Sequence, residues 1–166
     1  LEFRRVLFRS EPFDPMLING ASLDIRLGNS LKILTPVGFT DEEEWIFQGA
    51  LPSVPYLFRP GGRVLCCSLE RIRLPLDVAA MFFLKSSMGR QFLEHMHAGF
   101  VDPGYEGNLT LELKNENPFN PQAIYPGMRI GQLTFFRLNA PAEIDYSIVG
   151  RYSGDTTAQE AKPEDY

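Results

Sequence analysis

Turn-forming residues constrain the fold of this chain more than any other feature. Thirteen prolines and fourteen glycines interrupt short segments rich in Val, Ile, Leu, Phe and Thr. Because proline and glycine mark turns and end helices, this pattern predicts many short strands and an all-β barrel or jelly-roll-like domain. One short helix is expected from Met88 to about Glu94. The expected strands are Ser22–Arg26, Leu31–Leu34, Trp45–Phe47, Tyr56–Phe58, Arg63–Arg73, Ala79–Lys85, His95–Phe100, Asn108–Asn115, Gln122–Ile124 and Arg129–Arg137.

The overall composition excludes several classes of protein. The 166 residues fit one domain, with 44% hydrophobic and 22% charged residues, which is typical of globular proteins. The net charge of −5 creates no field that would attract nucleic acid or an anionic membrane. No apolar run is long enough to span a bilayer. The only cysteines, Cys66 and Cys67, are adjacent and suit neither a disulfide nor a metal knuckle, so a cytoplasmic location is expected.

Composition also divides the chain into three parts. Residues 1–10 mix basic and apolar side chains and do not merge with the segment after them, so we interpret them as a non-native or truncated N-terminal segment. Residues 11–149 form the predicted β domain. Residues 150–166 are polar and irregular, which predicts a flexible tail or a flap that orders over a ligand.

Glu112 is the first candidate for chemistry. In a strand, the period of two places Leu111 and Leu113 on one face and Thr110, Glu112 and Lys114 on the other. The simpler interpretation is a half-exposed amphipathic strand. In the functional interpretation this face lines a pocket, where desolvation raises the pKa of the carboxyl group towards neutrality and lets it exchange protons.

Lys85–Arg90 forms a candidate anion site. Two serine hydroxyls, backbone N–H groups and a helix start lie between Lys85 and Arg90, whose guanidinium can bind phosphate oxygens bidentately. The alternative is a serine helix cap with two surface cations.

Other candidates have two interpretations each. Asp102 is either a simple turn residue or a group that binds a sugar hydroxyl or activates water. Gln132 is either a buried hydrogen-bonding group or a ligand contact. His95 and His97 share a face of the predicted strand, and packing or pocket lining is favoured over a metal pair, because no third ligand is visible.

Taken together, these segments resemble the dCTP deaminase branch of the dUTPase-like superfamily. The resemblance rests on motifs at Asn19–Asn29, Lys85–Arg90, Ala98–Gly104, Thr110–Asn115, Tyr125–Leu133 and Gly150–Asp155. It implies a dUTPase-like β-clip, or distorted jelly-roll barrel with one or two short helices, and a homotrimer whose active sites are shared between subunits. It further implies hydrolytic deamination of dCTP to dUTP and ammonia, with Mg²⁺ bound only with the triphosphate. Zinc-dependent deaminases carry His-x-Glu and a later Pro-Cys-x-x-Cys, and this chain has neither.

Matching positions imply the roles of single residues. Glu112 would be the general base and acid, with Ser86 and Arg90 bordering the water. The implied substrate-binding residues are Lys85, Ser86, Ser87, Met88, Gly89, Arg90, Asp102, Thr110, Leu111, Glu112, Gln132, Tyr146, Arg151 and Asp155. Asp155 stands where the family typically has Gln, and a carboxylate near a triphosphate is unfavourable unless it faces away or meets Mg²⁺.

Two alternatives to simple deamination remain. A dUTPase, or a bifunctional dCTP deaminase and dUTP diphosphatase, would use Asp102 to activate water at the α-phosphate. A non-catalytic nucleotide-binding trimer would keep the fold with a degraded site.

Overall fold

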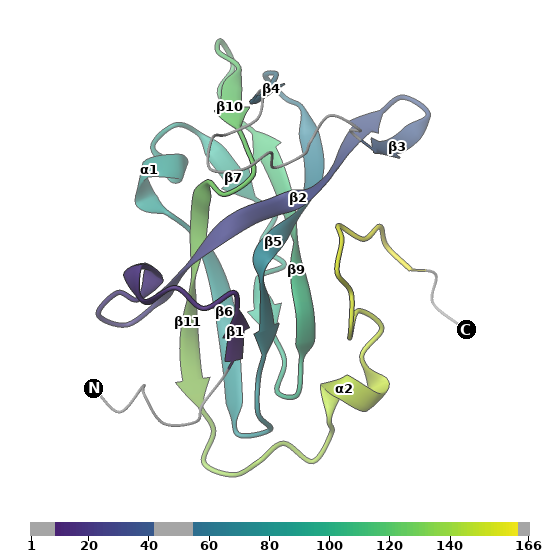
Figure 1. The fold of residues 1–166 in the computed structure, drawn as a ribbon. Coiled ribbons are helices and arrows are strands. Elements are labelled where there is room, and N and C mark those ends of the chain that lie inside the picture. Colours follow the sequence, from purple (N-terminus) through teal and green to yellow (C-terminus); the bar gives the residue numbers. More distant parts are fainter. Residues whose placement is uncertain (1–8, 42–54, 163–166) are drawn as a thin grey trace.

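The computed structural model describes residues 9–41 and 55–162 and confirms a mainly β architecture (Figure 1). The eleven strands described are β1 (Arg9–Glu11), β2 (Leu23–Thr35), β3 (Gly38–Asp41), β4 (Tyr56–Phe58), β5 (Arg63–Arg73), β6 (Val78–Leu84), β7 (Leu93–His95), β8 (Phe100–Val101), β9 (Glu106–Asn115), β10 (Gln122–Ile124) and β11 (Arg129–Arg137). The helices described are a 3-10 turn, η2 (Pro15–Leu17), and two α-helical turns, α1 (Ser86–Gly89) and α2 (Tyr146–Val149). None of these helices is long and apolar enough to cross a membrane.

One curled sheet organises the domain. Its strand order is β7-β9-β5-β2-β11-β6-β8, with β1 added to β5 and β3 added to β2, while β4 and β10 form a separate pair. The 13-residue strand β2 runs diagonally through the middle of Figure 1 and pairs with β5 and β11. This strand therefore joins the half of the sheet that contains β9 to the half that contains β6.

Strand β9 carries the alternation that the sequence predicts. Its odd-numbered residues from Gly107 to Asn115 are buried, and its even-numbered residues are partly exposed. Leu109, Leu111 and Leu113 belong to the main hydrophobic core. The opposite face, with Thr110 and Glu112, is left available for a site.

Several predicted elements agree with the structure. β4, β5, β10 and β11 have the predicted bounds, and the two predicted strands between Ser22 and Leu34 are parts of the single strand β2. The predicted strand Trp45–Phe47 lies outside the described residues. β1, β3, η2 and α2 were not predicted, and β1 includes Arg9 and Ser10.

Two predictions between Met88 and Phe100 are wrong. The helix begins earlier and ends at Gly89, because Leu93–His95 pairs with β9 instead of continuing a helix. The predicted strand His95–Phe100 ends at His95, since His97 has a φ of 64°, a left-handed conformation that interrupts an extended strand.

Candidate active site

A cavity of about 470 Å³ opens beside the exposed face of β9. It is lined by Phe39, Leu65, Ala98, Phe100, Val101, Asp102, Tyr105, Asn108, Leu109, Thr110, Glu112, Tyr146, Tyr152, Asp155, Gln159 and Ala161. Its walls therefore come from β9, from the turn after β8, from α2 and from the C-terminal tail.

The cavity lies where the strand pairing of β9 is interrupted. One edge of β9 pairs with β5. On the other edge, β7 reaches only Leu113–Asn115, and Met96 N donates a hydrogen bond to Glu112 O (3.0 Å). Near the start of β9 the C-terminal tail contacts this edge instead, since Asn108 N donates a hydrogen bond to Asp155 O at 2.8 Å. Within the described ranges no strand pairs with this edge from Leu109 to Glu112, and the cavity occupies that gap.

The carboxylate of Glu112 faces both the cavity and a buried histidine. Its side chain is 33% exposed, whereas that of His95 is 7% exposed. Glu112 Oε2 and His95 Nε2 lie 3.2 Å apart, yet both atoms are buried and neither makes a hydrogen bond within the part of the chain that the structure describes. Glu112 thus has one sheltered oxygen inside a side chain that reaches the cavity.

Asp102 begins a turn that is tied to α2. Gly104 adopts a φ of 83°, and Tyr146 N donates a hydrogen bond to Pro103 O at 3.3 Å. The ring of Tyr146 packs against Tyr105 with centroids 5.8 Å apart. Burial raises the pKa of both phenols, so both hydroxyl groups stay neutral, and that of Tyr105 donates a hydrogen bond to Asn108 O at 2.9 Å.

The tail contributes Asp155 together with its own counterion. Lys162 Nζ lies 3.2 and 3.3 Å from the two carboxylate oxygens of Asp155 and also donates to Arg151 O at 2.6 Å. The ammonium stands 4.8 Å from the ring centroid of Tyr152. Lys162 therefore neutralises the carboxylate of Asp155 within the tail.

The structure separates the predicted site residues into two groups. Asp102, Thr110, Glu112, Tyr146 and Asp155 line the cavity. Those that do not line it are Lys85, Ser86, Ser87, Met88, Gly89, Arg90, Leu111, Gln132 and Arg151. In Figure 1 the segment carrying α1 and the tail lie on opposite sides of the fold.

Lys85, in the second group, has a strong partner of its own. Its ammonium lies 2.7 and 2.8 Å from the carboxylate oxygens of Asp24, which is buried and also accepts a hydrogen bond from Asn19 (2.7 Å). Arg129 adds a second cation 3.6 Å from Asp24. In this structure the charge of Lys85 therefore belongs to a structural ion cluster with Asp24 and Arg129.

The remaining members of the second group differ in exposure. Met88 and Leu111 are buried in the main core, so their side chains point away from the cavity. Gln132 accepts a hydrogen bond from Ser22 Oγ at 3.0 Å on the other half of the sheet. Arg90 and Arg151 are exposed.

Sequence reasoning missed several residues of the cavity. Tyr105, Asn108 and Gln159 reach it through long-range folding, and no local pattern marks them, whereas Tyr152 lies in the Gly150–Asp155 motif but was not named as a site residue. His97 was expected to pack or line a pocket like His95, but its side chain is 87% exposed and contacts Glu94 at 3.1 Å. The described residues contain no cluster of three or more His, Cys, Asp and Glu side chains that could hold a metal ion.

Comparison with known proteins identifies the family. Residues 4–138 match the family model described as dCTP deaminase-like. The chain belongs to this family. The resemblance read from the motifs is thereby confirmed, and the prediction of a deaminase is confirmed at the level of the family.

Curated relatives of the chain share the name dCTP deaminase, dUMP-forming. The chain is 37% identical to a dCTP deaminase, dUMP-forming, of Corynebacterium efficiens over 155 residues, covering 87% of this chain and 80% of the relative. It is 40% identical to the protein of that name from Mycolicibacterium gilvum over 164 residues, covering 92% and 86%.

Solved structures support the fold. A 2′-deoxycytidine 5′-triphosphate deaminase from Agrobacterium tumefaciens superposes with a TM-score of 0.63 at 21% identity, covering 77% of this chain and 41% of that one. A dUTPase from phage phi11 of S. aureus gives 0.55 at 13% identity, covering 84% and 95%. The dUTPase-like fold predicted for this chain is confirmed.

Proposed function

We propose that this chain deaminates dCTP by hydrolysis, with Glu112 as general base and acid, and that its final product is dUMP. The observation that carries the proposal is that Glu112 and Asp102 face one cavity, each from a segment that matches a family motif. One site then holds a group for each of two successive hydrolytic steps.

In the first step Glu112 carries out the proton transfers. Its carboxylate takes a proton from the water that attacks C4 of cytosine, gives a proton to N3, and assists the departure of ammonia, so that dCTP and water yield dUTP and ammonia. A carboxylate that reaches the cavity suits this role, because a proton-transfer group must lie within hydrogen-bond reach of the reacting atoms. Thr110, two residues before it on the same face, lies beside the base.

The second step distinguishes dUMP from dUTP as the product. Asp102 would activate the water that attacks the α-phosphate, releasing pyrophosphate and leaving dUMP. The names of the relatives favour this bifunctional reaction over deamination alone. Mg²⁺ enters with the triphosphate of the substrate, and the cytoplasm, where nucleotides are made, is the proposed location.

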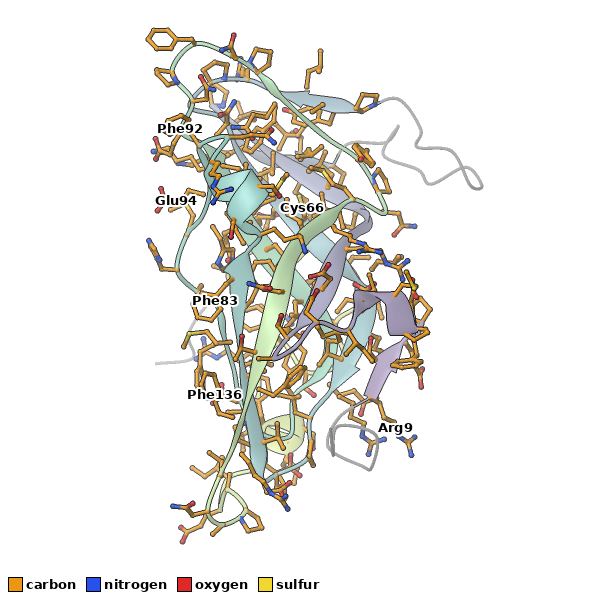
Figure 2. All side chains as sticks on the ribbon, turned by 90° about the vertical axis from the view of Figure 1, so that its left-hand side faces the viewer. Arg9, Cys66, Phe83, Phe92, Glu94 and Phe136 are labelled. Carbon is orange, nitrogen blue, oxygen red and sulfur yellow. The ribbon has the colours of Figure 1, made fainter. Side chains whose placement is uncertain are left out.

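A complete site requires a second copy of the chain. Lys85–Arg90 and Gln132 do not reach the cavity of their own subunit, which supports a homotrimer in which each subunit supplies these groups to its neighbour. The strand register places Phe83, Phe100 and Phe136 on the same face of the β11-β6-β8 sheet as Gln132, and all three rings are exposed. Figure 2 shows Phe83 and Phe136 projecting from the same side of the molecule. An apolar face of this kind suits burial against a copy.

Product analysis with dCTP, dCMP and dUTP tests the reaction. Wild-type protein should release ammonia from dCTP and accumulate dUMP. Glu112→Gln should lower the deamination rate by about 10²–10⁴-fold, the usual contribution of a general acid-base group. Lys114→Gln is the matched control, since Lys114 lies two residues further along the same face and pairs with Glu116. Equal rates for wild type and Glu112→Gln would refute the mechanism, and tight dCTP binding without turnover would indicate the non-catalytic alternative.

Asp102→Asn tests the second step. The ratio of dUTP to dUMP should rise, because deamination persists while attack at the α-phosphate is slowed. If wild-type protein stops at dUTP, the chain is a deaminase only.

Mixing two inactive variants tests the shared site. Arg90→Ala and Glu112→Gln, unfolded and refolded together in equal amounts, should regain activity, because about a quarter of the sites in randomly mixed trimers combine an intact Glu112 with a neighbour's intact Arg90. No recovery from a correctly assembled mixture would show that both residues act within one subunit.

A further inference from the structure

We propose that His95 is a positioning residue for Glu112: its Nε2–H holds the buried carboxylate oxygen and thereby directs the other oxygen into the cavity. This inference rests on the proposed function, in which Glu112 is the proton-transfer group. It gives a role in the reaction to a histidine for which the sequence predicts only packing or pocket lining.

The contact between the two side chains is close but incomplete. His95 Nε2 and Glu112 Oε2 lie 3.2 Å apart, and both are buried polar atoms without a hydrogen bond to any described residue. Leaving two such atoms unpaired is costly, whereas pairing them with each other removes the cost for both. A small rotation of either side chain brings the atoms into hydrogen-bonding geometry, which is commonly attained only in the reacting complex.

Charge decides which partner donates. An ionised carboxylate has only acceptor sites, so Nε2 must carry the hydrogen for the contact to be attractive. Neutral histidine protonated on Nε2 and the imidazolium cation both meet this requirement. In either form His95 binds one oxygen of Glu112 and leaves the other free to face water.

His95 is itself held rigidly. It pairs with Leu113 in the β7–β9 register, and the next residue, Met96, donates its N–H to Glu112 O. The imidazole packs edge-on against the ring of Phe82 with centroids 4.9 Å apart. Because the histidine and Glu112 are anchored to the same stretch of sheet, the ring can fix a rotamer of the carboxylate.

Loss of this contact should act on the chemical step. A carboxylate released from His95 samples rotamers that do not aim at the attacking water, while the residues that bind the nucleotide stay in place. The maximal rate should therefore fall and the Michaelis constant should change little, because misplaced proton-transfer groups slow chemistry more than binding.

Three variants test the rate effect, measured as kcat and KM for dCTP. His95→Phe keeps a ring without a donor and should lower kcat by about tenfold or more with KM within about threefold. His95→Gln places an amide N–H near the position of Nε2 and should recover most of the rate. His97→Gln is the matched control, since His97 is two residues away and exposed. Thermal melting of each variant checks that it is folded.

A second readout does not depend on turnover. The chain has only two histidines, so ¹⁵N-histidine labelling of the intact protein yields simple spectra. The Nε2–H of His95 should exchange slowly with solvent, and this protection should be lost in Glu112→Leu but kept in His97→Gln. The inference is overturned if His95→Phe retains wild-type kcat or if His95→Gln is as slow as His95→Phe. It is also overturned if the exchange rate of the His95 Nε2–H is the same in Glu112→Leu as in wild type. Absence of dCTP turnover in wild-type protein would instead refute the proposed function. The spectra would still show whether the Nε2–H of His95 bonds to Glu112.

Discussion

Ala158→Asp should detach the end of the tail from the cavity without unfolding the domain. Ala158 is 1% exposed and packs in a small cluster with Leu65 and Cys67, against which Phe39 also packs. An aspartate at this position would bury a carboxylate among apolar groups, and none of its neighbours in that cluster is a cation.

The structure sets an upper limit on the stability that this change can remove. Ala158 N donates to Ser30 Oγ at 3.0 Å, and Gln159 N donates to Thr110 Oγ1 at 3.1 Å. Each hydrogen bond contributes about 1 kcal/mol, the buried methyl group about 0.8 kcal/mol and the Lys32–Glu160 pair, 3.2 Å apart, less than about 1 kcal/mol. Docking of residues 157–160 is therefore worth under about 4 kcal/mol, and the contacts of Lys162 with Asp155 and Tyr152 lie within the tail and are kept. Burying an unpaired carboxylate costs several kcal/mol, and the added volume about 1–3 kcal/mol more, so release of the tail is the cheaper response.

Hydrogen exchange measured by mass spectrometry checks this reasoning. Protection should be lost in residues 157–160 and kept at Asn108 and Gly154, whose amides bond Asp155 O and Glu106 O. Urea unfolding should show a loss of less than about 4 kcal/mol, and kcat/KM should fall because Gln159 leaves the cavity wall. Thr156→Asp, at an exposed position two residues earlier, is the control. A larger loss of stability with the tail still protected would show that the tail is part of the core.

Two further predictions concern the core. Leu111→Ala should lower the free energy of unfolding by about 2–5 kcal/mol, because a fully buried leucine is lost from the main cluster, while Thr110→Ser on the opposite face should change it little; urea titration measures both. Burial raises the pKa of the Cys66 thiol above its ordinary value of 9.0, so the unfolded chain releases this proton first and stability should decline as the pH rises past about 9. Cys66→Ala should flatten that decline in unfolding experiments between pH 7 and 10.

Local patterns predicted the parts of the fold that depend on neighbours in sequence. The alternation around Glu112 gave the correct faces of β9, because side chains of a strand point alternately to its two sides whatever the partner. The turns at Pro and Gly gave the exact bounds of β5 and β11. The predictions for the segment from Met88 to Phe100 were wrong, because local propensity does not show pairing with β9 or the left-handed backbone of His97.

The sequence named candidate residues for the site, but it did not predict which of them lie together. Motif order places Arg90 and Glu112 in the same stretch of sequence, whereas in the fold Glu112 lines the cavity and Arg90 does not. The contact of Glu112 with His95 joins two strands, and Lys162 neutralises Asp155 from seven residues away in an irregular segment. Such pairings depend on tertiary geometry, which no periodicity encodes.

The interrupted edge of β9 also matters for handling the protein. Backbone groups at an unpaired strand edge can recruit a strand from another molecule, which is a common start of aggregation. Here the tail continues the cover that β7 begins, and among the described residues it leaves a short stretch of this edge beside the cavity without a paired strand. Proteolytic removal of the tail would therefore lengthen the unpaired edge of β9 and also remove one wall of the cavity. We expect such trimming to lower both the solubility and the activity of the protein.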